Sequence, residues 1–94
     1  MKPQRLVLKI GTNVLQRPNG KLDYNQISEF TQLVAEIRSQ KHEVLIISSG
    51  AVGAGRELCR FDSAENPLIQ KQILASVGQA RLMQIYTDFL REHH

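Results

Sequence analysis

The sequence predicts an α/β protein built on a mainly parallel sheet. Two short segments, residues 6–10 and 44–47, are apolar on both faces, which is typical of strands in parallel sheets that helices cover. A helical pattern lies between them, so the order along the chain is strand, helix, strand. Such a unit joins its two parallel strands by a right-handed crossover.

The first strand is followed by turn chemistry. Residues 6–10 read Leu-Val-Leu-Lys-Ile and stop at Gly11, and residues 11–22 are rich in turn-forming side chains. Within them, Asn19 and Gly20 predict the tight turn of a small hairpin.

The helix between the strands has a clear start. Asp23 is a good N-cap, and Gln26 three residues later predicts a capping box. The helix is expected to end near Gln40. Its apolar side chains recur at helical spacing and form one stripe: Ile27, Phe30, Leu33, Val34 and Ile37.

Two more helices follow the second strand. Residues 51–59 are expected to form a short helix, and residues 60–65 a loop. Asn66 as N-cap with Pro67 at the first helical position then predicts a long helix over residues 67–90.

The long helix has two different halves. We expect its first half to bury one face, and we interpret Gly78 as an interruption that costs about 1 kcal/mol relative to alanine. From Leu82 onward, apolar side chains surround most of the helix, which therefore needs cover from more than one side. The expected face of the first half comprises Ile69, Ile73, Val77 and Ala80.

Composition narrows the function classes. The 94 residues suffice for one domain, and the net charge of +3 comes from 12 basic and 9 acidic residues that interleave. Without a basic face or aromatic platform, this segment is not expected to contact nucleic acid. The longest aliphatic run, residues 44–47, cannot span a membrane. A lone Cys59 predicts neither a disulfide nor a metal site, and it fits the cytoplasm.

The first motif with chemical meaning is a lysine followed by a glycine turn. Lys9 lies at the end of the first strand, and Gly11 and Thr12 follow it. Successive N–H groups in such a turn can bind an anion, for which phosphate is the natural candidate. The alternative is an ordinary glycine turn with Lys9 reaching past the sheet edge into water.

The second motif is a run of small residues after the second strand. Ser49, Gly50 and Ala51 open it, and glycines recur at Gly53 and Gly55. Small residues leave room for a ligand beside a helix N-terminus. The alternative is a tight connection that needs small residues for packing alone.

The two motifs together favour phosphoryl transfer. Parallel strands place both loops at one edge of the sheet, where ligands of α/β proteins bind. Phosphoryl transfer asks a protein mainly for positioning and charge neutralisation, which lysine and backbone N–H groups provide. Ser49 lacks the G-x-S-x-G setting of a hydrolase nucleophile.

Three segments carry a resemblance to a known family. Residues 9–15 (KIGTNVL), 48–55 (SSGAVGAG) and 71–83 (KQILASVGQARLM) resemble the glutamate 5-kinase family, a branch of the amino acid kinase family. The first two are shared loosely among amino acid kinases, and the third is specific to this branch. Asn13 departs from the serine that many members have there.

The resemblance implies an architecture and a reaction. The fold would be the N-terminal part of a three-layer αβα sandwich, with residues 1–94 supplying the glutamate-binding side and the start of the phosphate loop. The activity would be ATP-dependent phosphorylation of the side-chain carboxylate of L-glutamate to glutamyl 5-phosphate, assisted by Mg²⁺, as the first step of proline biosynthesis. The full-length enzyme would be a homo-oligomer.

The resemblance also implies residue roles. Lys9 would contact the transferred phosphoryl group, with Gly11 and Thr12 in the phosphate loop, and residues 49–51 would hold glutamate. No residue here is assigned to a metal. Two alternatives remain: a relative acting on acetylglutamate, aspartate or a nucleoside monophosphate, and a non-catalytic oligomerisation module.

We therefore predict that these 94 residues alone have no measurable glutamate kinase activity. Of the reaction-centre groups that the family implies, only one lysine (Lys9) and two anion-binding turns are present, whereas the second reaction-centre lysine, an acidic residue and the adenine pocket are not in this sequence. A coupled assay of ADP release tests this. Glutamate-dependent turnover by the purified chain would contradict it.

Overall fold

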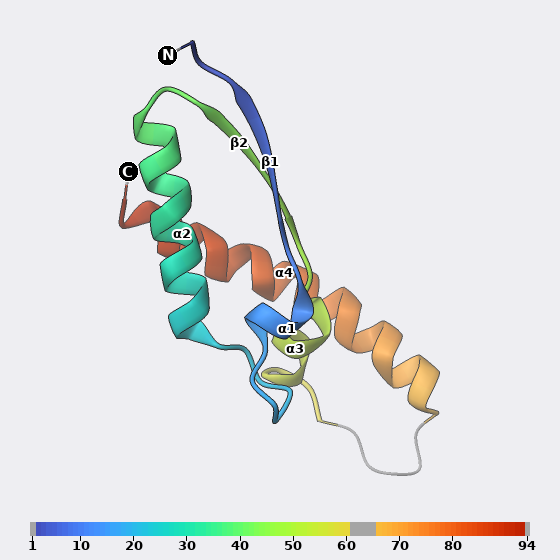
Figure 1. The fold of residues 1–94 in the computed structure, drawn as a ribbon. Coiled ribbons are helices and arrows are strands. Elements are labelled where there is room, and N and C mark those ends of the chain that lie inside the picture. Colours follow the sequence, from blue (N-terminus) through green and yellow to red (C-terminus); the bar gives the residue numbers. More distant parts are fainter. Residues whose placement is uncertain (1, 61–65, 94) are drawn as a thin grey trace.

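The computed structural model describes residues 2–60 and 66–93 and confirms the α/β class (Figure 1). Within these residues, two strands and four helices follow one another. They are β1 (Arg5–Ile10), α1 (Thr12–Leu15), α2 (Tyr24–Ser39), β2 (Glu43–Ser48), α3 (Ala51–Arg56) and α4 (Pro67–Arg91).

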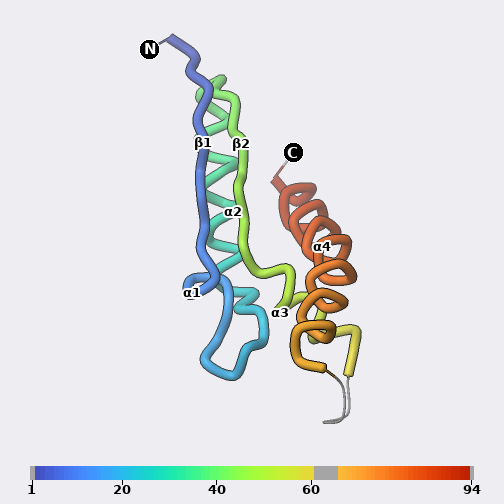
Figure 2. The backbone as a smooth tube through the Cα atoms, turned by 90° about the vertical axis from the view of Figure 1, so that its right-hand side faces the viewer, coloured from blue at the N-terminus to red at the C-terminus, as the bar shows by residue number. Residues whose placement is uncertain are grey.

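The two strands form the predicted parallel pair. They run in register from Arg5 opposite Glu43 to Ile10 opposite Ser48, so both end at the same edge. The pairing continues one step further, because the Ser49 N–H donates to the Ile10 carbonyl at 3.0 Å. α2 lies along one face of the sheet, and α4 lies beside β2 (Figures 1 and 2).

The other face of the sheet is open. Side chains alternate between half-buried and exposed along both strands, and Val7, Leu45 and Ile47 are 57%, 57% and 49% exposed. The prediction that both faces are buried is therefore wrong for the part of the chain that the structure describes. The described helices leave this face uncovered.

The hairpin before α2 is confirmed, with a different turn. Gln16 and Leu22 form an antiparallel bridge, and the Gly20 N–H donates to the Arg17 carbonyl at 2.9 Å. The turn is thus centred on Pro18 and Asn19, one residue earlier than predicted. Proline favours the second position of such a turn, and Gly20 takes the fourth with a φ of +82°.

The N-cap of α2 is confirmed, but its capping box is wrong. The Asp23 carboxylate accepts from the N–H groups of Asn25 and Gln26 at 3.1 and 3.3 Å. The Asp23 N–H, which the box would give to the Gln26 side chain, instead donates to the Leu15 carbonyl at 2.7 Å. This bond ties α2 to the end of α1.

The buried stripe of α2 differs from the prediction at one position. Ile27 and Val34 are buried as expected, whereas Leu33 is 48% exposed. Thr31 completes the buried stripe instead, and its hydroxyl donates to the Ser28 carbonyl at 3.0 Å. Spacings of four and three residues keep positions 27, 31 and 34 on one side of the helix.

The two later helices keep their predicted starts. α3 begins at Ala51 but ends at Arg56 rather than near Cys59, whose N–H closes a turn on the Gly55 carbonyl at 2.9 Å. Asn66 caps α4, since its side chain accepts from the N–H groups of residues 68 and 69. The expected loop at 60–65 lies, apart from Arg60, outside the described residues.

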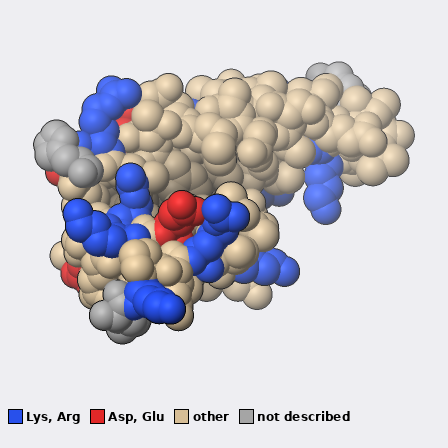
Figure 3. Space-filling model, turned by 90° about the horizontal axis from the view of Figure 1, so that it is seen from above, with Lys and Arg blue, Asp and Glu red and all other residues tan. Residues whose placement is uncertain are grey.

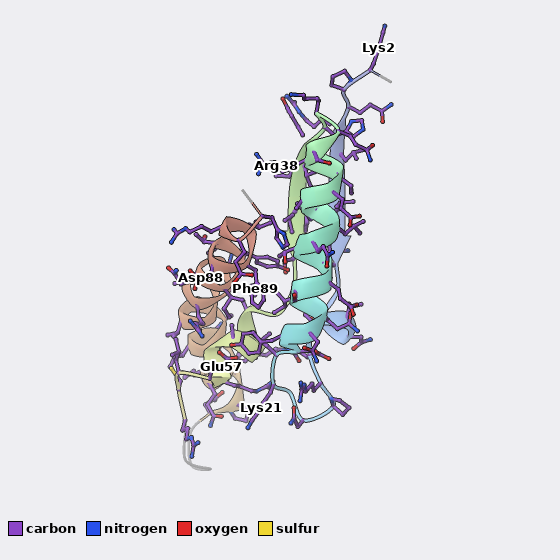
Figure 4. The ribbon with its side chains drawn as sticks, turned by 90° about the vertical axis from the view of Figure 1, so that its left-hand side faces the viewer. Lys2, Lys21, Arg38, Glu57, Asp88 and Phe89 are labelled. Carbon is purple, nitrogen blue, oxygen red and sulfur yellow. The ribbon has the colours of Figure 1, made fainter. Side chains whose placement is uncertain are left out.

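The buried face in the first half of α4 is not the predicted one. Ile69 and Ile73 are 50% and 39% exposed, and Met83 is also exposed. The residues that α4 buries are Leu74, Gly78, Leu82, Ile85 and Tyr86. Of these, Leu82, Ile85 and Tyr86 join the core formed with Ile10, Leu15, Leu22, Ile27 and Ala54. Phe89 lies between α4 and α2 in Figure 4.

Gly78 explains this shift of face. A Cβ built on Gly78 would overlap the carbonyl oxygen of Ala51, and one on Gly55 would overlap the carbonyl of Leu74. The backbones of α3 and α4 are therefore in direct contact, which only glycine permits at these two positions. The interpretation of Gly78 as a mere interruption of the helix is wrong.

Seen from above, the surface has no continuous patch of side chains of one charge (Figure 3). There, Lys and Arg side chains lie in separate groups with acidic side chains among them (Figure 3). The exposed ion pair of Arg5 with Glu43, at 2.8 Å, is one such mixture. Within the described residues, no helix is long and apolar enough to cross a membrane.

We predict that Gly78→Ala destabilises the chain by about 1–3 kcal/mol, because its methyl group overpacks the contact with α3. Gln79→Ala, at an exposed neighbouring position, should stay within about 0.5 kcal/mol of wild type. Urea unfolding followed by circular dichroism measures both. Helix propensity alone favours alanine by about 1 kcal/mol, so a stabilised Gly78→Ala would contradict the contact.

Candidate active site

A cleft of about 420 Å³ lies at the edge of the sheet where β1 and β2 end. Residues from α1, from the loop after β2, from α3 and from α4 surround it. Its lining consists of Thr12, Gln16, Ser48, Ser49, Gly50, Ala51, Val52, Arg56 and Lys71. This is the edge at which parallel α/β sheets bind ligands.

The structure brings four of the six predicted site residues together. Thr12 lines the cleft with the run from Ser49 to Ala51. Lys9 does not line it, because Lys9 pairs in register with Ile47 and lies on the exposed face of the sheet. The alternation of side chains along β1 places Lys9 on the face opposite to the buried Ile10.

Gly11 lies outside the lining as well, and the chain itself does not require glycine there. It is the N-cap of α1, with an extended backbone (φ −88°, ψ 166°) that other residues adopt. A Cβ built on it would meet no atom within 4 Å. The space in front of Gly11 is therefore open to a ligand.

Gly50 has a conformational role of its own. Its φ of +105° turns the chain from β2 into α3, and a Cβ there would lie 3.3 Å from Leu15 Cδ1. The Gly50 carbonyl accepts the first hydrogen bond of α3, from the Ala54 N–H at 2.9 Å. A side chain at this position would be strained whatever it binds.

The packing alternative holds for the later glycines of this run. A Cβ on Gly53 would lie 2.5 Å from Nε2 of Gln16, and Gly55 contacts the backbone of α4. Packing thus requires glycine at Gly55, whereas a methyl group at Gly53 would only have to displace the Gln16 side chain. Ser49 and Ala51 line the cleft. The ligand-binding interpretation therefore fits the start of the motif, and the packing interpretation fits its later glycines.

Ser48 is a cleft residue that the sequence prediction missed. Its hydroxyl donates to the Ser49 carbonyl at 2.8 Å and lies 2.8 Å from the Tyr86 hydroxyl. Because the Ser48 hydroxyl has a single proton, Tyr86 is the donor in the second bond. Burial raises the pKa of Tyr86, and the Ser48 hydroxyl offsets this in part, because it can turn and donate to the phenolate. This chain of hydrogen bonds fixes the loop after β2 against α4.

Arg56 and Lys71 are further lining residues that sequence reasoning missed. Arg56 ends α3, and Lys71 lies in the second turn of α4. The sequence contained a signal for both residues. Arg56 follows the glycine run directly, and Lys71 opens the stretch that is most specific to the family, residues 71–83. The lining contains these two cations and no carboxylate.

A small polar network holds the end of α3. The Tyr24 hydroxyl donates to the Glu57 carboxylate, 2.5 and 2.7 Å from its two oxygens, and Arg81 Nε lies 3.4 Å from Oε2. Burial is the largest cause that raises the pKa of Tyr24, and the hydrogen bond to Glu57 raises it further. The bond with Tyr24 raises the pKa of Arg81. Glu57, next to Arg56, lies between α2 and α4 in Figure 4.

The arrangement is equipped to bind a small anion. The cleft offers hydroxyl groups, an amide and two cations but no carboxylate or histidine to act as a general base. Among the described residues there is also no group of three or more His, Cys, Asp or Glu that could hold a metal ion. Its chemistry is therefore positioning and charge neutralisation.

Known proteins are similar to this sequence. The family model of the amino acid kinase family matches residues 4–94. A glutamate 5-kinase of Lactococcus lactis subsp. cremoris is 36% identical over 93 residues, which are 99% of this chain and 34% of that protein. One from Deinococcus radiodurans is 43% identical over 84 residues, 89% of this chain and 23% of that protein. One from Bacillus cereus is 40% identical over 93 residues, which are 99% of this chain and 25% of that protein. The chain thus spans about a third or less of the length of these relatives.

We predict that Tyr86→Phe lowers the free energy of unfolding at pH 7 by about 0.5–1.5 kcal/mol, since one hydrogen bond is lost. Above pH about 10, the unfolded chain releases the tyrosine proton before the folded chain does, because the folded pKa is raised. The stability that a raised pKa contributes is fully present at a pH below the pKa of the unfolded chain. It disappears as the pH rises through the pKa of the folded chain.

The difference between wild type and Tyr86→Phe should therefore narrow as the pH is raised from 9 to 11. Urea unfolding at pH 7, 9, 10 and 11 measures it for both chains. A difference that stays constant over this range would show that Tyr86 is not held in its neutral form by the fold.

Proposed function

This chain belongs to the amino acid kinase family, and we propose that it provides the glutamate-binding side and the start of the phosphate loop of a glutamate 5-kinase. The reaction is ATP-dependent phosphorylation of the side-chain carboxylate of L-glutamate to glutamyl 5-phosphate, the first step of proline biosynthesis. The observation that carries this proposal is the cleft at the strand ends, which has two cations and no carboxylate. The relatives named glutamate 5-kinase support the choice of substrate.

In this proposal, residues 49–51 hold glutamate. Ser49 offers a hydroxyl group, and Gly50 and Ala51 leave the backbone accessible from the cleft. The Ser48 hydroxyl and Tyr86 hold this loop in place through the Ser49 carbonyl. A loop fixed before the ligand arrives loses less conformational entropy on binding.

Lys9, Gly11 and Thr12 face the phosphate in the proposed reaction. ATP supplies the γ-phosphoryl group that an oxygen of the glutamate carboxylate accepts as ADP leaves. The residues fit this group, because the open space at Gly11 admits a close approach to the backbone and Thr12 adds a hydroxyl group beside the cleft. The Lys9 ammonium neutralises charge that develops on the transferred group.

Mg²⁺ is assigned to no residue of this chain. A kinase of this kind uses the ion with ATP, but the cleft lining has no carboxylate, and metal-binding clusters are absent from residues 2–60 and 66–93. We therefore derive no step through the ion here.

The family likeness underlies the remaining proposals. We place the enzyme in the cytoplasm, as a homo-oligomer at full length that contacts no nucleic acid through this segment. The apolar side chains on the open face of the sheet, Val7, Leu45 and Ile47, favour burial against further protein.

A chimera tests the proposed function. Residues 1–94 would replace the matched part of the Lactococcus lactis glutamate 5-kinase, and ADP release would be measured with L-glutamate, N-acetylglutamate, L-aspartate and UMP. We predict turnover with L-glutamate well above that with the other three. Preference for one of those substrates would assign the chain to another member of the family.

The matched control is the same chimera with Lys9→Ala. Loss of one donor to the transferred group should cost about 2–4 kcal/mol of transition-state stabilisation, chiefly in kcat, with the KM for glutamate little changed. A chimera that is folded and binds ATP but turns over no substrate would overturn the proposed function.

A further inference from the structure

The cleft lining contains two cations, Arg56 and Lys71. Arg56 is the last residue of α3, Lys71 belongs to the neighbouring α4, and Thr12 follows β1. Direct backbone contact between α3 and α4 at Gly55 and Gly78 fixes these two helices relative to each other.

Arg56 is held in place from two directions. Its Nη1 lies 3.1 Å from the position that a Cβ on Gly20 would take, so the guanidinium rests against the hairpin. The next residue, Glu57, is fixed by Tyr24 and Arg81. The ion pairs within the described residues are Arg5 with Glu43 and Arg81 with Glu57, and neither Arg56 nor Lys71 takes part in one.

Unpaired cations in one cleft attract anions. A concave site lined by charge of one sign raises the local concentration of the opposite ion. An arginine can bind a carboxylate through two parallel hydrogen bonds, and a lysine adds a compact charge beside it. Arg56 of α3 and Lys71 of α4 thus equip the cleft to bind one carboxylate.

We propose that Arg56 and Lys71 bind the α-carboxylate of glutamate and so determine substrate specificity; this inference rests on the proposed function. Glutamate has two carboxylates, and the reacting one must approach Lys9 and Thr12 at the end of β1. The other carboxylate then extends along the cleft toward α3 and α4, where Arg56 and Lys71 lie.

The experiment is an NMR titration of the full chain, in which the amide shifts of residues 49–51 report binding. L-glutamate is the reference ligand. L-glutamine keeps the α-carboxylate and lacks the side-chain charge, whereas the α-amide of glutamate keeps only the side-chain charge. Inorganic phosphate is the fourth probe, because the same cations could bind it. The dispersion of the spectra checks that every variant is folded.

Arg56→Gln and Lys71→Gln should each raise the Kd for L-glutamate and L-glutamine roughly tenfold, as expected for loss of one charge-assisted hydrogen bond. The Kd for the α-amide should change less than about twofold in both variants. Lys21→Gln is the matched control: it removes the same charge from the hairpin, outside the cleft lining (Figure 4), and should leave all four affinities unchanged.

Three results would overturn the inference. The first is an unchanged affinity for L-glutamine in both variants, and the second is a loss of affinity confined to the α-amide. The third is phosphate binding that is tighter than carboxylate binding and depends on the pair. The proposed function is judged separately by the substrate preference of the chimera, so the two failures are distinguishable.

Discussion

The backbone contact between α3 and α4 is the constraint on which the rest of the structure depends. Gly78 lets the Ala51 carbonyl reach the surface of α4, and Gly55 does the same for Leu74. The contact sets which face of α4 is buried and where the helix lies relative to the sheet. A single β-carbon at Gly78 would force the helices apart, so this geometry requires glycine rather than merely tolerating it.

The arrangement of the cleft follows from this contact. With α4 fixed against α3, Lys71 near its start reaches the cleft and Tyr86 near its end reaches Ser48. The loop after β2 is then held by the Tyr86 hydroxyl through Ser48 and by the turn at Gly50, whose φ of +105° glycine adopts without strain. Residues far apart in sequence become one site through a helix placed by glycine.

The sequence alone was sufficient for features governed by local chemistry. The caps at Asp23 and Asn66 depend on nearby residues and were predicted correctly, and the order strand, helix, strand predicted the parallel pairing. The short helix α1 was not predicted, since its segment is rich in turn-forming residues. The buried face of α4 was not, because apolar periodicity cannot distinguish Ile73 from Leu74 when a glycine decides the contact. Lys71 was missed for the same reason, since its place in the cleft depends on how α4 packs.

The position of Lys9 constrains how the proposed reaction can use both parts of the site. Strand alternation directs Lys9 to the open face of the sheet, whereas Ser49 and Thr12 line the cleft beyond the strand ends. A substrate that contacts both must therefore lie across the end of β1, over the exposed Gly11. There a side chain would occupy the space that the transferred group needs, although nothing in the chain itself fills it. The open space at Gly11 is thus the feature that joins the two faces into one reaction path.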